Sequence, residues 1–298
     1  MKQHLLYIFI LTLLTTACST TEHGDKKSSG HEFNGFYSGE YLSQVAFPIG
    51  GIGAGMISLD GTGAFSQVSV RNKPDVTNTP FMFAAISVKG FENGARILEG
   101  PVQQWKYFGD PSTSSLIFGC PRFENASFTA RFPFGKISLS DPNLPLDVTI
   151  TGWSPFIPTD ADNSSLPVGA LEYTFTNTSG KELDAVFSFN AENFMRVTIP
   201  GGEWGNPVVG HDSIMQLDNG FILEQSCFPD KPHYKGEFAI FTDEPGAVTD
   251  YCWFRGGWFD SKTLLWKHIQ QGDMPANPVT DGATGASVYI PVKLGGKE

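Results

Sequence analysis

Short runs in which apolar and polar residues alternate follow one another from about residue 81 to the end of the chain. These runs are rich in β-branched and aromatic residues, and Gly, Pro, Asn or Asp separates them, which is the pattern of strands joined by turns. The segments that fit are 81–88, 126–132, 136–140, 146–151, 168–178, 182–190, 221–226, 237–242, 248–254 and 286–293. Because helical windows are nearly absent, the pattern predicts an all-β fold, a large antiparallel β-sandwich.

Two local signals refine this fold. Apolar residues recur at helical spacing over 261–271, where Asp260 or Ser261 can cap the start and Gly272 the end. We therefore expect one short helix near the C-terminus. The tetrapeptide Asn177–Gly180 lies between two alternating runs, which predicts a hairpin turn that joins neighbouring strands.

Glycine is unusually dense between Gly50 and Gly63, where it fills six of fourteen positions. Such density is typical of backbone that turns left-handed or lies close against another surface. The residues on either side of Asp60–Gly61 alternate between apolar and polar, which predicts a β-hairpin. A phosphate-binding loop would need a helix directly after the glycines and a dinucleotide or Walker spacing, and neither is present.

Three motifs in this chain resemble glycoside hydrolase family 116, which contains the non-lysosomal glucosylceramidase. The first is Pro48–Gly55, followed by the hairpin and by Asn72-Lys73-Pro74. The second is Asp162–Gly169, which leads into a strand, and the third is Trp258–Gly272, which resembles a short helix late in the family's N-terminal domain. The motifs occur in the family's order, and the similarity covers most of residues 40–294.

The resemblance implies hydrolysis of β-glucosides with retention, which uses two carboxyl groups about 5–5.5 Å apart. In the family both carboxylates belong to a helical barrel that follows the sandwich, and no residue of this chain matches those motifs. We therefore expect no catalytic residue here. The expected role is a non-catalytic β-sandwich that supports hydrolysis by a C-terminal (α/α) barrel, which is absent from this sequence, so whether the chain is itself an enzyme stays open.

The barrel and a β-glucoside are the partners that the resemblance implies. The glycine hairpin and the loop after it are expected to face the barrel, because close approach of the backbone would explain the glycines. The residues expected at this domain interface are Gly50, Gly51, Gly53, Gly55, Arg71 and Asn72. One face of the sandwich is then expected to be exposed and apolar.

Other chemistry is poorly supported by the residues. Asp160 and Asp162 lie in a proline-rich loop, where exposed acids are usually solvated charges, and the spacing after Asp160 fails the EF-hand pattern. No G-x-S-x-G nucleophile motif occurs. No C-x-x-C or H-x-x-x-H spacing occurs either, so we expect no metal and no cofactor.

Aromatic residues give a second hypothesis. Trp253, Phe254, Trp258 and Phe259 surround Arg255-Gly256-Gly257, and aromatic faces stack on sugar rings while polar neighbours bond hydroxyls. Trp253 and Trp258 are therefore candidate sugar-stacking residues, although a core cluster explains the same pattern. A free-standing carbohydrate-binding or interaction lipoprotein is the alternative function, and an intact small hydrolase is the third.

The N-terminus predicts export. A basic start, an apolar run from Leu5 to Leu14 and small residues before Cys18 are typical of a bacterial lipoprotein signal, although an ordinary secretory peptide explains most of it. We expect 1–18 to be the signal, 19–43 a flexible tether and 44–298 the sandwich. Lipidated Cys18 would anchor the protein to a membrane of the cell envelope, on its periplasmic or surface side.

Charge and cysteine content narrow the choice further. The net charge of −11 argues against nucleic-acid binding, which depends on Lys and Arg. After Cys18 only Cys120, Cys227 and Cys252 remain, so at most one disulfide can form. We therefore expect buried cysteines and no disulfide framework.

Overall fold

The structure of this protein, a computed structural model, describes residues 32, 35–71, 74–76, 79–104, 106, 118–199, 208–255 and 261–297. Cys18, the predicted signal and most of the predicted tether lie outside the described residues, as do Asn72 and Trp258. Residues 36–298 form one compact unit. Within the described part of this unit, no helix is long and apolar enough to cross a membrane.

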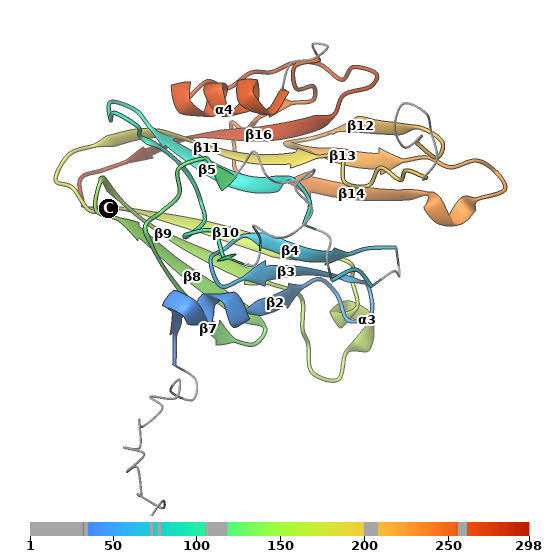
Figure 1. Ribbon diagram of the computed structural model, residues 1–298, viewed down its shortest axis with the longest axis horizontal. Coiled ribbons are helices and arrows are strands. Elements are labelled where there is room, and N and C mark those ends of the chain that lie inside the picture. Colours follow the sequence, from blue (N-terminus) through green and yellow to red (C-terminus); the bar gives the residue numbers. More distant parts are fainter. Residues whose placement is uncertain are drawn as a thin grey trace, which may run out of the picture. The chain divides into compact units, whose positions relative to one another are not determined.

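Two five-stranded antiparallel sheets make the sandwich, as Figure 1 shows. The first, called the β8 sheet, has the order β1 (Tyr37–Ser38), β7 (Asn125–Arg131), β8 (Phe134–Asp141), β9 (Leu144–Trp153) and β10 (Ala170–Asn177). The second, called the β11 sheet, has the order β15 (Val248–Asp250), β16 (Gly285–Leu294), β11 (Leu183–Glu192), β5 (Met82–Val88) and β6 (Ala95–Ile97). The predicted antiparallel sandwich is therefore confirmed.

Two smaller antiparallel sheets extend the sandwich. One contains β12 (Asp212–Leu217), β13 (Gly220–Gln225) and β14 (Gly236–Phe241), and the other contains β2 (Ala46–Ile49), β3 (Met56–Asp60) and β4 (Phe65–Ser69). The pairing of β3 with β4 confirms the predicted glycine-rich hairpin. Its turn is fixed by the Asp60 carboxylate, which accepts the backbone N–H groups of Thr62 at 2.8 Å and Ala64 at 3.1 Å.

The core lies between the two large sheets, and alternate residues of β8 and β9 are buried in it. Aromatic side chains meet across it, since the ring of Phe187 on β11 lies 5.0 Å from that of Tyr173 and 6.0 Å from that of Phe175 on β10. Every residue of β5 is buried, because the other face of its sheet is covered as well.

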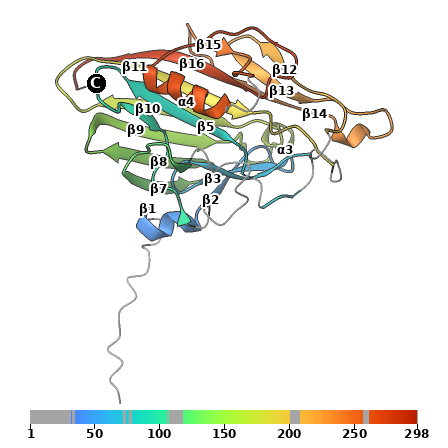
Figure 2. The ribbon, with the colours of Figure 1, turned by 45° about the horizontal axis from the view of Figure 1, so that its top comes forward.

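Helix α4 (Ser261–Gln271) covers that outer face, as Figure 2 shows, and its bounds are those predicted. Its buried residues Leu265 and Ile269 pack in a second apolar cluster, which contains Phe81, Phe83, Ala85, Ala95, Ile97 and Trp253. Shorter helices, which the sequence did not predict, are the 3₁₀ helix η1 (Gly39–Gln44), α3 (Ala161–Ser164) and the 3₁₀ helix η3 (Pro232–Tyr234).

The predicted end of the tether at residue 43 is wrong. Strand β1 pairs with β7, and Leu42 in η1 is buried in the core. The backbone of Leu42 lies so close to Gly61 that a Cβ there would be 2.6 Å from the Leu42 carbonyl oxygen. The sandwich therefore begins at about residue 36, where Tyr37, Leu42 and Val45 pack against the core.

The predicted hairpin at Asn177 is also wrong. Strand β10 pairs with β9, whereas β11 pairs with β5 and β16, so the turn crosses from one sheet to the other. The buried Asn177 amide donates to the carbonyl oxygens of Lys181 at 2.6 Å and Gly295 at 2.7 Å, while its oxygen accepts the N–H of Ser179 at 2.9 Å. These bonds fix a corner of the sandwich.

Candidate functional site

The glycine loop, residues 50–55 between β2 and β3, lies against the turn that contains α3. The N–H of Gly50 donates to Ser154 Oγ at 2.6 Å, and the N–H of Ile52 donates to the Ser164 carbonyl at 2.9 Å. A Cβ at Gly51 would overlap the carbonyl of Leu166, so only glycine fits there. Two of the three motifs that suggested the family, Pro48–Gly55 and Asp162–Gly169, are therefore neighbours in space.

The glycines do not all serve the same purpose. Gly53 has a φ of 77° and no atom within 4 Å of its Cβ position, so it is needed for a left-handed turn at the exposed tip of the loop. Gly55 has a φ of 99°, and a Cβ there would lie 2.5 Å from the Ser69 carbonyl oxygen of β4. The expected close approach of backbone is thus present within the domain, and contact of this loop with a barrel stays a prediction.

Large apolar side chains are exposed around the glycine loop, and we call them the apolar patch. Each is between 40% and 68% exposed. The members are Ile52, Phe132, Phe134, Phe156, Ile157, Leu166 and Val168. The rings of Phe132 and Phe156 meet at 4.8 Å, and the N–H of Ile157 donates to Ser164 Oγ at 2.9 Å, so the patch joins the β7–β8 turn to the α3 loop.

Arg71, predicted at the domain interface, is used within the domain. Its Nη2 donates to the Met195 carbonyl at 2.6 Å, and its guanidinium lies where a Cβ on Gly236 would approach Nε to 2.9 Å. Burial lowers the pKa of this guanidinium. Arg71 therefore links the end of β4 to the start of β14, and the interface prediction for Asn72 lies outside the described residues.

Two exposed acids, Asp160 and Glu172, have structural roles. The carboxylate of Asp160 caps α3 by accepting the backbone N–H of Asn163 at 3.0 Å. Hydrogen bonds from the side chain and the backbone of Asn163 lower the pKa of this carboxyl. Glu172 on β10 accepts the indole N–H of Trp153 at 2.7 Å. The contacts of Asp160 fit its interpretation as a surface charge, and Glu172 is engaged with Trp153.

Three buried carboxylates are neutralised by cations. The ion pairs are Lys106–Asp60 at 2.6 Å, Arg122–Glu99 at 3.0 Å and Arg96–Asp141 at 2.8 Å. Burial alone would raise the pKa of Asp141, but hydrogen bonds from Arg96 and Asn143, together with the charge of Arg96, leave it below its ordinary value. These acids stabilise the fold as pairs.

Asp250 at the end of β15 differs from them. It is 3% exposed, and no Lys or Arg among the described residues lies within ion-pair distance of its carboxylate. Burial raises the pKa of this carboxyl, although hydrogen bonds from Cys252 and Asn277 oppose the shift. A buried acid without a cation is an indicator of a functional site.

Asp250 lines a cavity of about 530 Å³ between α4, β15 and the segment that follows α4. The other lining residues that matter here are Phe254, Arg255, His268, Asn277 and Tyr289. No local sequence pattern indicates Asp250 or Tyr289, since they come together only through the pairing of β15 with β16.

Trp253, one of the two candidate sugar-stacking residues, lies beside this cavity but is 3% exposed. Its ring packs edge-on against Phe81 at 6.0 Å, and its indole N–H donates to Ser287 Oγ at 2.9 Å. Of the two interpretations that the sequence left open, this burial fits the core cluster. The adjacent Phe254 is 49% exposed and belongs to the lining of the cavity.

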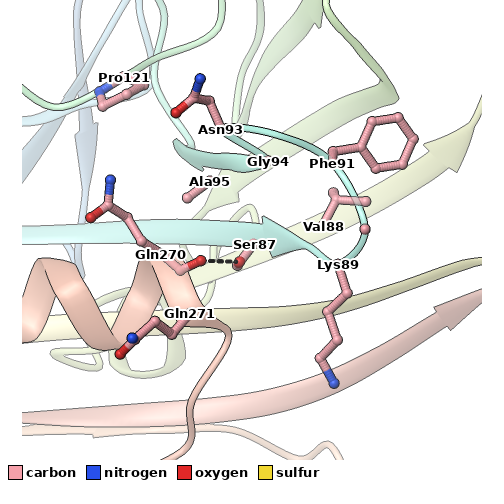
Figure 3. A pocket seen from close by; sticks show the side chains of 11 residues that line it. Ser87, Val88, Lys89, Phe91, Asn93, Gly94, Ala95, Pro121, Gln270 and Gln271 are labelled. Carbon is pink, nitrogen blue, oxygen red and sulfur yellow. Dashed lines mark hydrogen bonds between the residues drawn. The ribbon is translucent and has the colours of Figure 1, made fainter.

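A second cavity of about 360 Å³ lies between the β5–β6 turn and the end of α4 (Figure 3). The hydroxyl of Ser87 donates to the Gln270 carbonyl at 3.5 Å, and Lys89 is the charged residue of the lining. Because no carboxylate lines this cavity, its described residues offer no acid–base pair.

Metal and redox chemistry find no support in the described ranges. No group of His, Cys, Asp or Glu there could hold a metal ion. Cys227 and Cys252 are free thiols. Burial raises the pKa of the Cys120 thiol, which makes it less reactive than an ordinary cysteine.

The fold defines a class of protein, an antiparallel β-sandwich domain with a helix on one outer face and a glycine loop at one end. The family is given by its sequence model, described as beta-glucosidase 2, glycosyl-hydrolase family 116 N-term, which matches residues 46–298. The chain therefore belongs to this family, as its N-terminal domain, and the resemblance inferred from the motifs is confirmed. None of the curated proteins matches the chain closely enough to count as a relative.

Proposed function

We propose that this domain is a non-catalytic support for a C-terminal (α/α) barrel that hydrolyses β-glucosides. The observation that carries the proposal is the apolar patch around the glycine loop, built in part from two of the family's motifs. Monomeric proteins rarely expose contiguous apolar patches of more than a few hundred Å², and such patches are typical of interaction sites.

The energetics of the patch suit an interface between domains. Burying roughly 300 Å² of apolar surface contributes about 7 kcal/mol before the costs of association. Domain interfaces bury about 600–1,500 Å², so the patch would form the apolar centre, and a polar rim would complete it. Phe132 and Phe156 are the natural anchors, because aromatic side chains dominate interface energetics.

The acids of the domain also favour a supporting role. Three of the buried carboxylates are held by Lys or Arg, and the exposed Asp160 and Glu172 are engaged as a helix cap and a partner of Trp153. Retaining glycosidases need two cooperating carboxyl groups, one of which must be ready to take up and release a proton. Engaged acids are poor candidates for that task.

The experiment combines the purified chain with the catalytic barrel of a family-116 β-glucosidase produced as a separate polypeptide. Binding is measured by isothermal titration calorimetry, and hydrolysis of an aryl β-glucoside is measured for each component and for the mixture. We expect no turnover by the chain alone and binding between the two polypeptides.

A matched pair of variants makes the test specific to the patch. Phe132 in the patch is 68% exposed, and Phe241 on β14, outside it, is 69% exposed. Phe132→Ser is expected to weaken barrel binding by at least about tenfold, the effect of a typical hot-spot residue, whereas Phe241→Ser leaves it unchanged. Turnover by the chain alone, or equal loss in both variants, would contradict the proposal.

The second part of the proposal concerns location. We propose that Cys18 is lipidated and attaches the domain to a bacterial membrane, where two or more acyl chains give stable anchoring. Metabolic labelling with a radioactive fatty acid tests this. Label is expected in the wild-type protein and not in Cys18→Ala, and label retained by the variant would contradict the anchor.

A further inference from the structure

The outer face of the β11 sheet is divided into an apolar and a polar part. Helix α4 covers the apolar part through Leu265 and Ile269. The register of β11, β16 and β15 gathers polar residues on the rest of this face, since Ser188 pairs with Tyr289 and Asn190 with Ser287, which also pairs with Asp250. A helix–sheet contact normally buries apolar side chains, so this polar part needs a separate explanation.

The polar residues form a chain of hydrogen bonds that stops short of Tyr289. The Ser287 hydroxyl donates to Asn190 Oδ1 at 2.7 Å and accepts the Trp253 indole N–H, while Asn190 Nδ2 donates to Ser188 Oγ at 3.0 Å. Tyr289 is 1% exposed; the Ser287 side chain opposes the rise in its pKa that burial causes, but no described residue lies in good hydrogen-bond geometry to its hydroxyl. A buried hydroxyl without a partner is costly to the fold.

Tyr289 and Asp250 line the same cavity, so a buried hydroxyl and a buried carboxyl without a Lys or Arg in ion-pair distance among the described residues border one space. The carboxyl of Asp250 accepts the N–H of Cys252 at 3.2 Å and hydrogen bonds from Asn277, and its two oxygens retain further acceptor sites. Asn277 holds the opposite wall through Nδ2, which donates to the Cys252 carbonyl at 3.3 Å. The cavity therefore offers a hydroxyl donor, carboxylate acceptors and an amide.

The walls indicate what kind of molecule fits. Asp250 and Arg255 contribute opposite charges, and the His268 imidazole is engaged with Asp273 at 3.2 Å, so a neutral ligand is favoured. Phe254, Pro275 and Pro278 supply apolar surface. The cavity volume of about 530 Å³ lies within the range of about 300–1,000 Å³ that is typical of small-molecule sites.

We infer that this cavity is a saccharide-binding site, in which sugar hydroxyls donate to Asp250 and accept from Tyr289. A sugar is a neutral molecule whose hydroxyls donate and accept, and whose ring has an apolar face for a side chain such as Phe254. The inference does not depend on the barrel, because the cavity is formed by α4, β15 and β16 and not by the apolar patch.

The test uses the full chain with D-glucose and cellobiose, and with the open-chain polyol sorbitol as control. Binding is measured by saturation-transfer NMR and by the shift in melting temperature. Sugars also stabilise proteins by exclusion from the surface, so only a saturable shift that exceeds the sorbitol effect counts as binding. We expect such a shift for the wild-type protein with at least one of the two saccharides.

Two tyrosine variants separate the cavity from the fold. Tyr289→Phe removes a hydroxyl without a protein partner, so the melting temperature without ligand should not fall, while saccharide affinity should drop about threefold to tenfold. The Tyr251 hydroxyl donates to the Leu217 carbonyl at 3.1 Å. Tyr251→Phe should lower the melting temperature by about 2–4 °C and leave saccharide affinity unchanged.

Two results would overturn the inference. One is the absence of saturable binding of either saccharide to the wild-type protein. The other is a Tyr289→Phe variant that melts earlier than the wild type and binds saccharide equally well, because the hydroxyl would then serve the fold alone. Loss of barrel binding by patch variants would not affect either result.

Discussion

The glycine-loop end of the domain exposes apolar side chains, whereas the layer beneath α4 buries polar ones, and both arrangements are unusual in a folded domain. Around the glycine loop, backbone N–H groups such as those of Gly50 and Ile52 are hydrogen-bonded within the domain. Large apolar side chains there are exposed to solvent. Beneath α4, apolar residues are well packed, but the carboxyl of Asp250 is buried with a raised pKa, and no described residue lies in good hydrogen-bond geometry to the buried Tyr289 hydroxyl.

This difference indicates two kinds of partner. Exposed apolar surface is satisfied by another macromolecular surface, which gains free energy from the area that it covers. Buried polar groups that face a cavity are satisfied by a small molecule that supplies matching hydrogen bonds. One domain can have both, since the two regions are built from different elements.

The largest loss of stability is expected where a buried acid loses its cation. This loss serves as a reference for Asp250, a buried acid outside the Lys and Arg ion pairs of the described residues. Arg96→Met leaves the Asp141 carboxylate buried and uncompensated, so the free energy of unfolding should fall by about 3–5 kcal/mol in urea titrations. Lys89→Met breaks the exposed pair with Asp184 and should change the free energy of unfolding by less than about 1 kcal/mol. Equal effects would show that burial does not distinguish these pairs.

A smaller loss is expected at the glycine loop. Gly51→Ala forces a Cβ into the backbone of Leu166, and overpacking of this kind typically lowers the free energy of unfolding by about 1–3 kcal/mol. Gly180→Ala is the control, because no atom lies within 4 Å of its Cβ position. A Gly51→Ala variant as stable as the control would mean that the loop does not rest on the α3 turn.

The smallest change in stability is expected for a substitution at Asp250, and its size depends on pH. Because its folded pKa is raised, the folded protein keeps a proton that the unfolded chain releases above the ordinary pKa of 3.8. The contribution of the protonated Asp250 carboxyl to stability is fully present below pH 3.8 and is lost as the pH rises through the pKa of the folded state. Asp250→Asn should therefore melt like the wild type in acid and at a higher temperature at pH 7, and a lower melting temperature at pH 7 would contradict the assignment.

Local patterns predicted much of this fold. The period of the residues from 261 to 271 defined α4, and the turn at Asp60–Gly61 defined the β3–β4 hairpin, because both signals depend on neighbours in sequence. Asn177 misled the prediction, since a corner between sheets uses the same polar turn residues as a hairpin. Only pairing with distant strands separates the two.

The candidate sites were harder to predict for the same reason. The apolar patch collects side chains from the glycine loop, the β7–β8 turn and the α3 loop, and each of these is unremarkable alone. Asp250 and Tyr289 are separated by 39 positions in sequence but share a face because β15 pairs with β16. The motifs Pro48–Gly55 and Asp162–Gly169 indicated the family without indicating that they touch.

The most direct test of the two-partner account is hydrogen–deuterium exchange of the whole chain, measured with the barrel and then with cellobiose. The account predicts that the barrel slows exchange over 50–56 and 154–168 and leaves 273–284 unchanged. Cellobiose should slow exchange over 248–255 and 273–284 and leave the glycine loop unchanged. Protection of 273–284 by the barrel with none at 50–56, or no protection by either partner, would contradict it.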